Sequence, residues 1–354
     1  MEKTKNELIR ICKEQGISNY SNKNKEEIVK LIEKCDAPKN KLRMIDLFAG
    51  TGAFSYSFIN TRNVDVVFSN DMIDSSKKIY DMNFSHKLTL SDLHQIKETD
   101  IPQHDILTAG LPCQPFSIAG NQNGFEDSRS NVFWKLLSII DYHNPKCVIL
   151  ENVKNLVSHD DKKTFEIIKT NLEQRGYYIK YKILNTAEIT GIPHHRERIY
   201  IVCMKSKTVY DNFSLDFPNV EKRGIQEFLE TDINPRYYYN STSKIWDLLH
   251  KDVIKQNTVY QYRRVYVREN KSMECPTLTA NMGSGGHNVP IIRDSHGIRK
   301  ITPRECFNLQ GFSKTFQLPQ LSDSSLYQLV GNSVSVPIIH LIADRIVPLL
   351  LKED

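Results

Sequence analysis

From residue 43 onward the chain repeats one pattern, in which a short apolar run is followed by a turn of small residues and then by an amphipathic stretch. Short apolar runs are typical of strands buried in a sheet, and amphipathic stretches are typical of the helices that cover it. Strands that alternate with helices in this way predict an α/β fold built on a parallel sheet. We assign to this sheet residues 44–48, 64–68, 106–109, 148–150 and 199–202.

The length of the chain, 354 residues, exceeds that of an ordinary single domain and predicts two main domains. With 40% hydrophobic and 25% charged residues, its composition is that of a soluble globular protein. We identify no apolar stretch of about 18 residues, so we expect no membrane span. The first residues also lack the apolar core of a secretory signal, which favours a cytoplasmic protein.

The seven cysteines are an odd number and form no Cys-x-x-Cys pair. This argues against a disulfide framework and a thiolate metal site, so we expect reduced thiols and no bound metal. Cys147 and Cys203 lie inside apolar runs and are interpreted as small core residues. The net charge of +5 is compatible with a polyanionic partner but is too small to demand one.

The pattern of apolar and polar residues changes along the chain, which predicts four segments. Apolar residues at helical spacing near the start indicate a short helical hairpin, and aromatic, basic and glycine-rich stretches replace the strand–helix alternation after residue 205. The segment 332–351 regains an apolar helical face, so we expect its helix to return to the first domain, with a hinge near 302–311. The predicted segments are a hairpin at 1–36, a first domain at 41–205, an inserted domain at 206–301 and a returning segment at 302–354.

A glycine-containing turn follows the first apolar run. Ala49-Gly50-Thr51-Gly52 lets backbone approach a ligand closely, although a dinucleotide-binding turn would carry a third glycine at position 55, where this chain has serine. Asp71 ends the next apolar run and can accept hydrogen bonds from both hydroxyls of a ribose, a requirement shared by NAD and S-adenosylmethionine. Asp92 follows a third expected strand and can accept from an adenine amino group. The alternative for either acid is a helix N-cap.

A thiol and a carboxyl group are expected at the same edge of the sheet. Cys113 stands between Pro112 and Pro115 just after one apolar run, and Glu151 ends another. Because the carboxyl ends of parallel strands meet at one edge, the two side chains are placed to act together. The pair is suited to chemistry on a pyrimidine ring.

Methyl transfer to C5 of cytosine needs such a pair, because C5 is a poor nucleophile until a group adds to C6. The Cys113 thiolate can make that addition, provided that the site removes its proton. We expect Glu151, placed after an apolar strand, to face a closed pocket that raises its pKa, so that it can protonate N3 as the ring accepts charge. Arg196 and Arg198, on one side of an extended segment, can reach the O2 edge. The neighbouring His194 and His195 are interpreted as surface or phosphate-contacting residues rather than general bases.

Five motifs in this order resemble those of the bacterial cytosine-5 DNA methyltransferases of restriction–modification systems. The resemblance covers residues 43–350, and its motifs are Asp46-Leu47-Phe48-Ala49-Gly50, Pro112-Cys113-Gln114-Pro115, Glu151-Asn152-Val153, Arg196-Glu197-Arg198 and Gly331-Asn332-Ser333-Val334. It implies a Rossmann-like sheet that binds S-adenosylmethionine and an inserted target-recognition domain. It also implies Cys113 as the nucleophile, Glu151 at N3 and the exocyclic amine, Arg198 at O2, and Arg196 as a support.

The same matching implies a cofactor site formed mainly by the glycine turn and by the acids that follow the next strands. One departure is Met72, where members of the family often carry an aromatic residue; methionine can still pack there. The residues implied are Phe48, Ala49, Gly50, Thr51, Gly52, Asp71, Met72, Asp92, Leu93, Pro112, Asn332 and Val334.

Duplex DNA is the implied partner, and its target cytosine must leave the base stack before the thiol can reach it. Residues 114–131 resemble the family's mobile catalytic loop, and residues 260–268 and 277–288 resemble a target-recognition domain, although ordinary sheet packing also explains about half of the aromatic residues there. Arginines in these segments are expected on phosphates. The residues that we expect on DNA are Ser117, Arg129, Gln261, Arg263, Arg264, Thr279, Asn281, Gly285 and Gly286.

Residues 7–21 resemble the SAP-type helix–extension–helix motif, which often binds DNA. The alternative is a solvated helical hairpin tethered by residues 37–40. Three alternatives for the main domain are less consistent with the sequence. A tRNA methyltransferase would carry Cys-Phe-Thr where this chain has Asn155-Leu156-Val157, and a non-catalytic relative would lack the thiol or the acid. A nicotinamide oxidoreductase would give Cys113 no role. We therefore expect a monomeric methyltransferase that protects DNA from a partner endonuclease.

Overall fold

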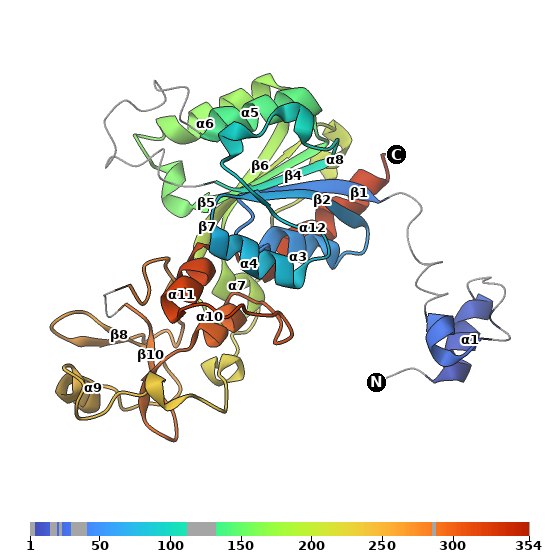
Figure 1. Cartoon of the computed structure of the whole chain (residues 1–354). Helices are drawn as coiled ribbons and strands as arrows, with labels where there is room; N and C mark the ends of the chain where they lie inside the picture. Colours follow the sequence, from blue (N-terminus) through green and yellow to red (C-terminus); the bar gives the residue numbers. More distant parts are fainter. Residues whose placement is uncertain are drawn as a thin grey trace.

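The computed structural model describes residues 4–14, 20, 23–29, 41–111, 132–284 and 288–353. Its main feature is a seven-stranded sheet with the strand order β3-β2-β1-β4-β5-β7-β6 (Figure 1). The strands are β1 (Leu42–Leu47), β2 (Val64–Asp71), β3 (Thr89–Leu90), β4 (Ile106–Gly110), β5 (Cys147–Val153), β6 (Tyr178–Asn185) and β7 (Glu197–Met204). The predicted α/β class is confirmed.

The sheet is not parallel throughout, which corrects the sequence-based prediction. Strands β3, β2, β1, β4 and β5 are parallel, whereas β7 is antiparallel to both β5 and β6. A parallel neighbour needs a long crossover, but only the short helix α7 (Thr186–Thr190) separates β6 from β7. The chain therefore reverses direction there. This reversal places the start of β7 beside the end of β5.

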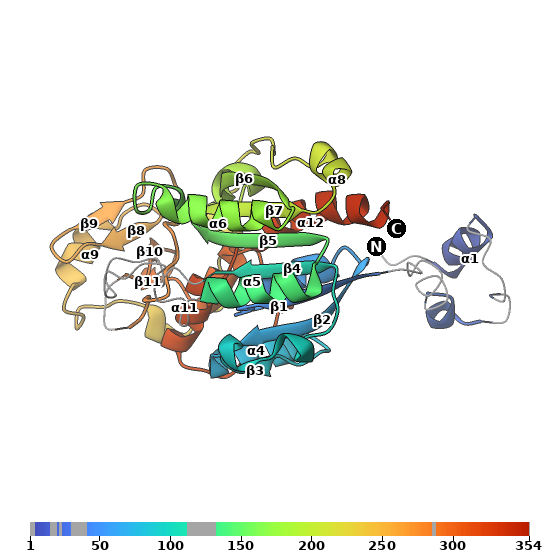
Figure 2. The same ribbon diagram turned by 90° about the horizontal axis from the view of Figure 1, so that it is seen from above.

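Helices cover both faces of the sheet, as Figure 2 shows. Helices α5 (Val132–His143) and α6 (Lys163–Gln174) bury apolar side chains in the core on one face. Helices α3 (Ala53–Ile59), α4 (Asp74–Asn83) and α12 (Val336–Leu351) do so on the other. Cys147 and Cys203 are fully buried, so their prediction as core residues is confirmed.

A second, four-stranded sheet has the order β11-β10-β8-β9, is antiparallel, and has its own small core with helix α9 (Trp246–Asp252). In both views helix α11 (Asp323–Asn332) lies between the two sheets, and α10 (Pro303–Leu309) lies beside it in Figure 1. The strands are β8 (Tyr260–Tyr262), β9 (Val267–Glu269), β10 (Ile291–Arg293) and β11 (Ile298–Lys300).

Short helices make the remaining connections. Helix α8 (Lys207–Asn212) lies beyond the boundary predicted at residue 205, yet it packs against α12 and the strands β6 and β7 of the large sheet. The segment predicted as a hinge is the start of α10, where Thr302 is the N-cap in a capping box with Glu305. The 3₁₀ helices are η1 (Leu93–Gln95), η2 (Glu98–Asp100), η5 (Lys154–Val157), η6 (Ile225–Phe228) and η7 (Pro235–Tyr237).

Helix α12 packs against α3, α7 and α8 of the first domain. The segment Asp323–Leu351 is, contrary to our expectation, long and apolar enough to cross a membrane by length and composition, but 56% of its apolar window is buried inside the protein. Its buried residues belong to the main core. That burial is the behaviour of a core helix.

The start of the chain contributes helix α1 (Lys5–Glu14) and a helical turn at residues 25–29. Leu8, Cys12 and Ile28 pack together in a separate small core. Both views show α1 apart from the two sheets (Figures 1 and 2).

Candidate active site

The turn between β1 and α3 is held in its conformation by glycine and by Asp71. Gly52 has a φ of 76°, and a Cβ atom there would lie 2.4 Å from the ring of Phe84, so a larger residue would collide with a buried aromatic side chain. The Gly50 N–H donates to Asp71 Oδ2 at 2.8 Å. The hydroxyls of Thr51 and Ser333 are 2.7 Å apart. The glycine turn therefore lies against the Gly331–Val334 segment, as a shared cofactor site requires.

Asp71 ends β2 and is almost fully buried. Its carboxylate accepts from the backbone of Gly50 and of Ile73, while burial raises its pKa. Hydrogen bonds from the Met72 backbone and the Ser76 side chain also oppose that rise in pKa, so the carboxylate is held from several sides at the end of β2. Met72, beside it, is 70% exposed and able to contact a bound ligand.

The other predicted cofactor residues differ in exposure. Asp92 is the N-cap of η1 and accepts from His94 N–H at 3.0 Å, so the N-cap alternative describes its contacts here. That backbone hydrogen bond lowers the pKa of Asp92. Leu93 and Val334 are buried, whereas Asn332 is exposed. Pro112 lies outside the described residues.

A buried acid beneath the glycine turn was missed by the sequence-based reasoning about the cofactor site. Asp46 is fully buried in β1, and its carboxylate accepts from the hydroxyls of Ser55 and Thr108 and from the Ser55 N–H. Burial raises its pKa to about 7. An acid in the middle of an apolar run is the signal that could have identified it.

Glu151 and Arg198 meet at the ends of neighbouring strands. Glu151 is 8% exposed near the end of β5, and Val153, two residues later, pairs with Arg198 on β7. Arg198 Nε lies 3.2 Å from Glu151 Oε1. Burial raises the pKa of Glu151, and the positive charges of Arg198 and Arg196 oppose that rise. The site therefore holds a carboxyl group that binds a proton more readily than usual, next to a fixed positive charge.

The end of β4 lies directly beside Glu151. Gly110 pairs with Glu151, and the Leu111 N–H donates to the Glu151 carbonyl at 3.2 Å. Asn152 Nδ2 donates to the Leu111 carbonyl at 3.3 Å. Cys113 is two residues further along the chain and lies outside the described residues, as do Ser117 and Arg129 on the following segment.

Arg196 is buried and joins three parts of the chain. Its guanidinium donates to the carbonyls of Leu278, Gly331 and Ser333. Gly331 is required at this junction, because a Cβ atom there would lie 2.3 Å from the Thr279 carbonyl carbon. Arg196 therefore ties the segment that follows Leu278 to the start of β7.

The interpretation of His194 as a surface or phosphate-contacting residue is wrong. His194 is fully buried, accepts from the Leu278 N–H at 3.2 Å through Nε2, and donates through Nδ1 to the Leu309 carbonyl at 3.2 Å. Burial holds its pKa well below the usual value, so the ring stays neutral. His195 instead has a half-exposed side chain, 3.1 Å from Glu274.

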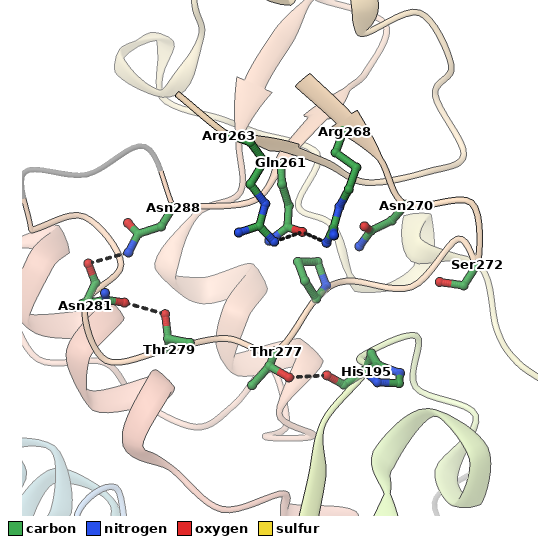
Figure 3. A pocket seen from close by; sticks show the side chains of 11 residues that line it. His195, Gln261, Arg263, Arg268, Asn270, Ser272, Thr277, Thr279, Asn281 and Asn288 are labelled. Atoms are coloured by element: carbon green, nitrogen blue, oxygen red, sulfur yellow. Dashed lines mark hydrogen bonds between the residues drawn. The ribbon is translucent and has the colours of Figure 1, made fainter. Parts of the chain in front are cut away.

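A cleft of about 620 Å³ lies between the β8–β9 hairpin and the loop 277–281 (Figure 3). Four of the predicted DNA-contacting residues line it: Gln261, Arg263, Thr279 and Asn281. Arg264 is exposed at the hairpin turn and does not line the cleft, and Gly285 and Gly286 lie outside the described residues. Arg268, Asn288 and His195 also line the cleft. Arg268 belongs to the arginines expected on phosphates and His195 was interpreted as a surface or phosphate-contacting residue, whereas Asn288 was not singled out.

The chain matches a known protein family over most of its length. The model of the C-5 cytosine-specific DNA methylase family matches residues 42–348. Type II methyltransferase M.Bsp6I of a Bacillus strain is 44% identical over 309 residues, which are 86% of this chain and 98% of that protein. Type II methyltransferase M.HhaI of Haemophilus parahaemolyticus is 33% identical over 89% of this chain and 97% of its own.

Solved structures share the fold. The Dnmt2 methyltransferase of S. pombe superposes with a TM-score of 0.68 at 21% identity, over 87% of this chain and 99% of its own. A putative DNA modification methyltransferase encoded within an E. coli prophage gives a TM-score of 0.65 at 17% identity, over 88% of this chain and 100% of its own. With this fold and the matched relatives, the chain belongs to the C-5 cytosine-specific DNA methylase family and is a DNA cytosine-5 methyltransferase of the type II restriction–modification kind.

Proposed function

We propose that this enzyme moves a methyl group from S-adenosylmethionine to C5 of a cytosine swung out of a specific duplex sequence, through a transient bond between Cys113 and C6. The observation that carries this proposal is the position of Glu151. Its carboxyl group is buried, paired with Arg198, and joined by β-sheet hydrogen bonds to the strand that leads to Cys113. An extruded base is needed because C5 and C6 are covered by stacking inside a duplex.

Each residue has one part in the reaction. The Cys113 sulfur forms a bond to C6, and the electron pair displaced from the C5–C6 double bond moves through the ring towards N3, where protonated Glu151 supplies the proton. Arg198 stabilises negative charge that develops on O2. The C5 atom, now nucleophilic, takes the methyl group that bound S-adenosylmethionine would supply, and S-adenosylhomocysteine would be the leaving group. Loss of the C5 proton to a base then re-forms the C5–C6 double bond and expels the Cys113 thiolate. Return of the N3 proton to Glu151 restores the aromatic ring and the free enzyme.

The residues around the glycine turn fit S-adenosylmethionine, which supplies an electrophilic methyl group when bound. We assign Asp71 to the ribose hydroxyls, because its carboxylate is fixed at the end of β2 beside the glycine turn by the N–H groups of Gly50 and Ile73. The turn at Gly50 is half-buried and nothing crowds its α-carbon, so its backbone can be approached by the remainder of the molecule. Phe48 and Met72 supply apolar contact, and Asp92 is assigned to the adenine amino group.

We infer that the enzyme acts in the cytoplasm as a monomer, because one chain carries both the cleft and the residues of the chemical site. Methylation of its own recognition sequence would protect host DNA from a partner endonuclease. Digestion with a restriction endonuclease tests this role. Plasmid DNA from cells that express the enzyme should resist an endonuclease of the same sequence specificity. Complete cutting of fully methylated plasmid would contradict the protective role.

A covalent trap tests the mechanism. Bisulfite sequencing of a plasmid treated with the enzyme gives the target site, and a duplex carrying 5-fluorocytosine at the target position is then incubated with enzyme and S-adenosylmethionine. Fluorine at C5 cannot leave as a proton, so we expect a stable adduct that peptide mapping places on Cys113. Cys113→Ser should form no adduct and transfer no methyl group. Transfer at the wild-type rate by Cys113→Ser would overturn the mechanism.

A further inference from the structure

The cleft beside the β8–β9 hairpin carries a defined cluster of side chains on one of its walls. Gln261 on β8 pairs with Arg268 on β9, so the two side chains lie on the same face of the two-stranded ribbon. Arg263 is two residues after Gln261 and shares that face. Figure 3 shows all three side chains pointing from the ribbon towards the loop that holds Thr277 and Thr279. We call Gln261, Arg263 and Arg268 the ribbon cluster.

Hydrogen bonds within the ribbon cluster use its one side-chain acceptor. Gln261 Oε1 accepts from Arg263 Nη2 at 3.2 Å and also from Arg268 Nη2. The polar groups that remain are the other guanidinium N–H groups and the Gln261 amide NH₂, all of which are donors. No ion pair joins either arginine to an acidic side chain of the described residues. The wall therefore presents only donors, together with two positive charges.

The opposite wall presents an acceptor. Asn288 donates through Nδ2 to the Asn281 carbonyl at 2.9 Å, which fixes its amide. Its Oδ1 atom is buried and has no hydrogen-bond partner among the described residues. The ribbon cluster itself offers donors only, so it is complementary to a ligand edge that carries acceptors.

Among base edges in the major groove of DNA, only that of guanine has two acceptors and no donor, namely N7 and O6. Adenine and cytosine each present an amino donor, and thymine presents a methyl group beside one acceptor. The paired cytosine offers the N4 amino group, a donor suited to Asn288 Oδ1. A two-stranded β-ribbon also has dimensions that the major groove accepts.

We propose that Arg268, oriented by Gln261, reads a guanine in the major groove, so that the recognition sequence of this enzyme contains a guanine at one fixed position besides the guanine that pairs with the target cytosine. The inference rests on the proposed function and adds to it a base identity and the residue that selects it. Arg268 is chosen over Arg263 because it belongs to the strand ladder and pairs with Gln261, whereas Arg263 lies in the turn. Gln261 is a positioning residue, because it holds the plane of the Arg268 guanidinium.

The test replaces one acceptor atom of the DNA at a time. Once the target sequence is known from bisulfite sequencing, duplexes are made in which each guanine is replaced singly by 7-deazaguanine, which pairs normally but lacks N7. With the full-length wild-type enzyme we expect kcat/KM to fall on the order of 10- to 100-fold at one position. The Arg268→Lys variant, which cannot make the bidentate contact, should be insensitive to the replacement at that position and should accept other bases there.

Arg264→Lys is the matched control. Arg264 is an exposed arginine of the same hairpin but does not line the cleft, so its variant should keep the wild-type sensitivity to 7-deazaguanine. Gln261→Ala should lose part of the base preference, because Arg268 keeps its charge but not its fixed orientation. Thermal unfolding should be unchanged in all three variants, because these side chains lie at the surface of the cleft.

Two results would overturn the inference. One is a methylated sequence in which no guanine responds to loss of N7 in the wild-type enzyme. The other is an Arg268→Lys variant that is weaker on every sequence by the same factor, with base preference intact, which identifies a phosphate contact instead. A wild-type enzyme that transfers no methyl group to any DNA is a different failure, because it refutes the proposed function itself.

Discussion

The carboxyl group of Glu151 lies 3.2 Å from the Nε atom of Arg198, although the two residues belong to antiparallel strands that enter the site from opposite directions. Burial favours the protonated carboxyl and the arginine opposes it. In the proposed reaction, a cytosine ring that accepts the proton at N3 converts Glu151 from its protonated to its ionised form. The pair thus couples proton transfer at one ring atom to charge stabilisation at another.

Glu151→Gln tests the need for that proton. We expect methyl transfer to slow on the order of 10²- to 10⁴-fold, because an amide keeps the shape but cannot act as an acid. The measurement is the rate of labelled methyl incorporation into plasmid DNA. In the wild-type enzyme the chemical step should also lose rate as pH rises through the raised pKa of Glu151, and the variant should lack this dependence. A variant within tenfold of the wild-type rate would exclude Glu151 as the acid.

Arg196→Lys tests the junction between the chemical site and the cleft. Lysine cannot reach the carbonyls of Leu278, Gly331 and Ser333 together, so we expect the free energy of unfolding to fall by about 2 kcal/mol and KM for DNA to rise more than kcat falls. Denaturant titration and steady-state kinetics measure the two effects. Arg43→Lys, at an exposed arginine on β1, is the control and should change neither. Equal stability of the two variants would contradict the structural role of Arg196.

Gly331→Ala tests the close approach of the last helices to the loop 277–281. The added Cβ atom would lie 2.3 Å from backbone, which cannot move aside cheaply, so we expect a loss of about 1–3 kcal/mol in the free energy of unfolding and weaker DNA binding. Thermal unfolding and a gel-shift assay provide the readouts. Gly224→Ala, where only the end of the flexible Gln226 side chain is near, should be neutral.

Asp46→Asn tests the acid buried under the glycine turn. The folded protein raises the pKa of Asp46 to about 7 from 3.8, so the folded state holds a proton that the unfolded state has already released. Its stabilising effect is complete below the unfolded value and is lost as pH rises towards 7. We expect the melting temperature of Asp46→Asn to change less than that of the wild type between about pH 4 and pH 7. Identical pH profiles for the two proteins would contradict the assignment.

The sequence indicated which acids stand at the ends of strands. Asp71 and Glu151 were identifiable because a run of buried residues that stops at a carboxylate marks the end of a strand in an α/β sheet. The direction of β7 was not identifiable in this way, because a buried strand has the same apolar pattern whether its neighbour is parallel or antiparallel. The length of the connection around α7 was the available signal.

Side-chain direction explains the error at His194. In extended backbone, adjacent side chains point to opposite faces, so one of two neighbouring histidines before a strand should be buried and the other exposed. The sequence therefore showed that the two histidines point to opposite faces, but it did not show which of the two faces is covered by other parts of the chain. The pairing of Arg268 with Gln261 was not predicted for a different reason, because it depends on how tightly the hairpin turns between them.

Helix α12 packs on α3, the helix that follows the glycine turn, so this contact joins segments almost three hundred residues apart. Closing so long a loop costs entropy, and such contacts form late in folding. While the ribosome is still making the polypeptide, the part of the large sheet's face that α12 covers stays open to water until residues 336–351 emerge. A cell therefore gains methylating capacity only from completed chains, and premature termination within this helix should yield material that chaperones and proteases remove.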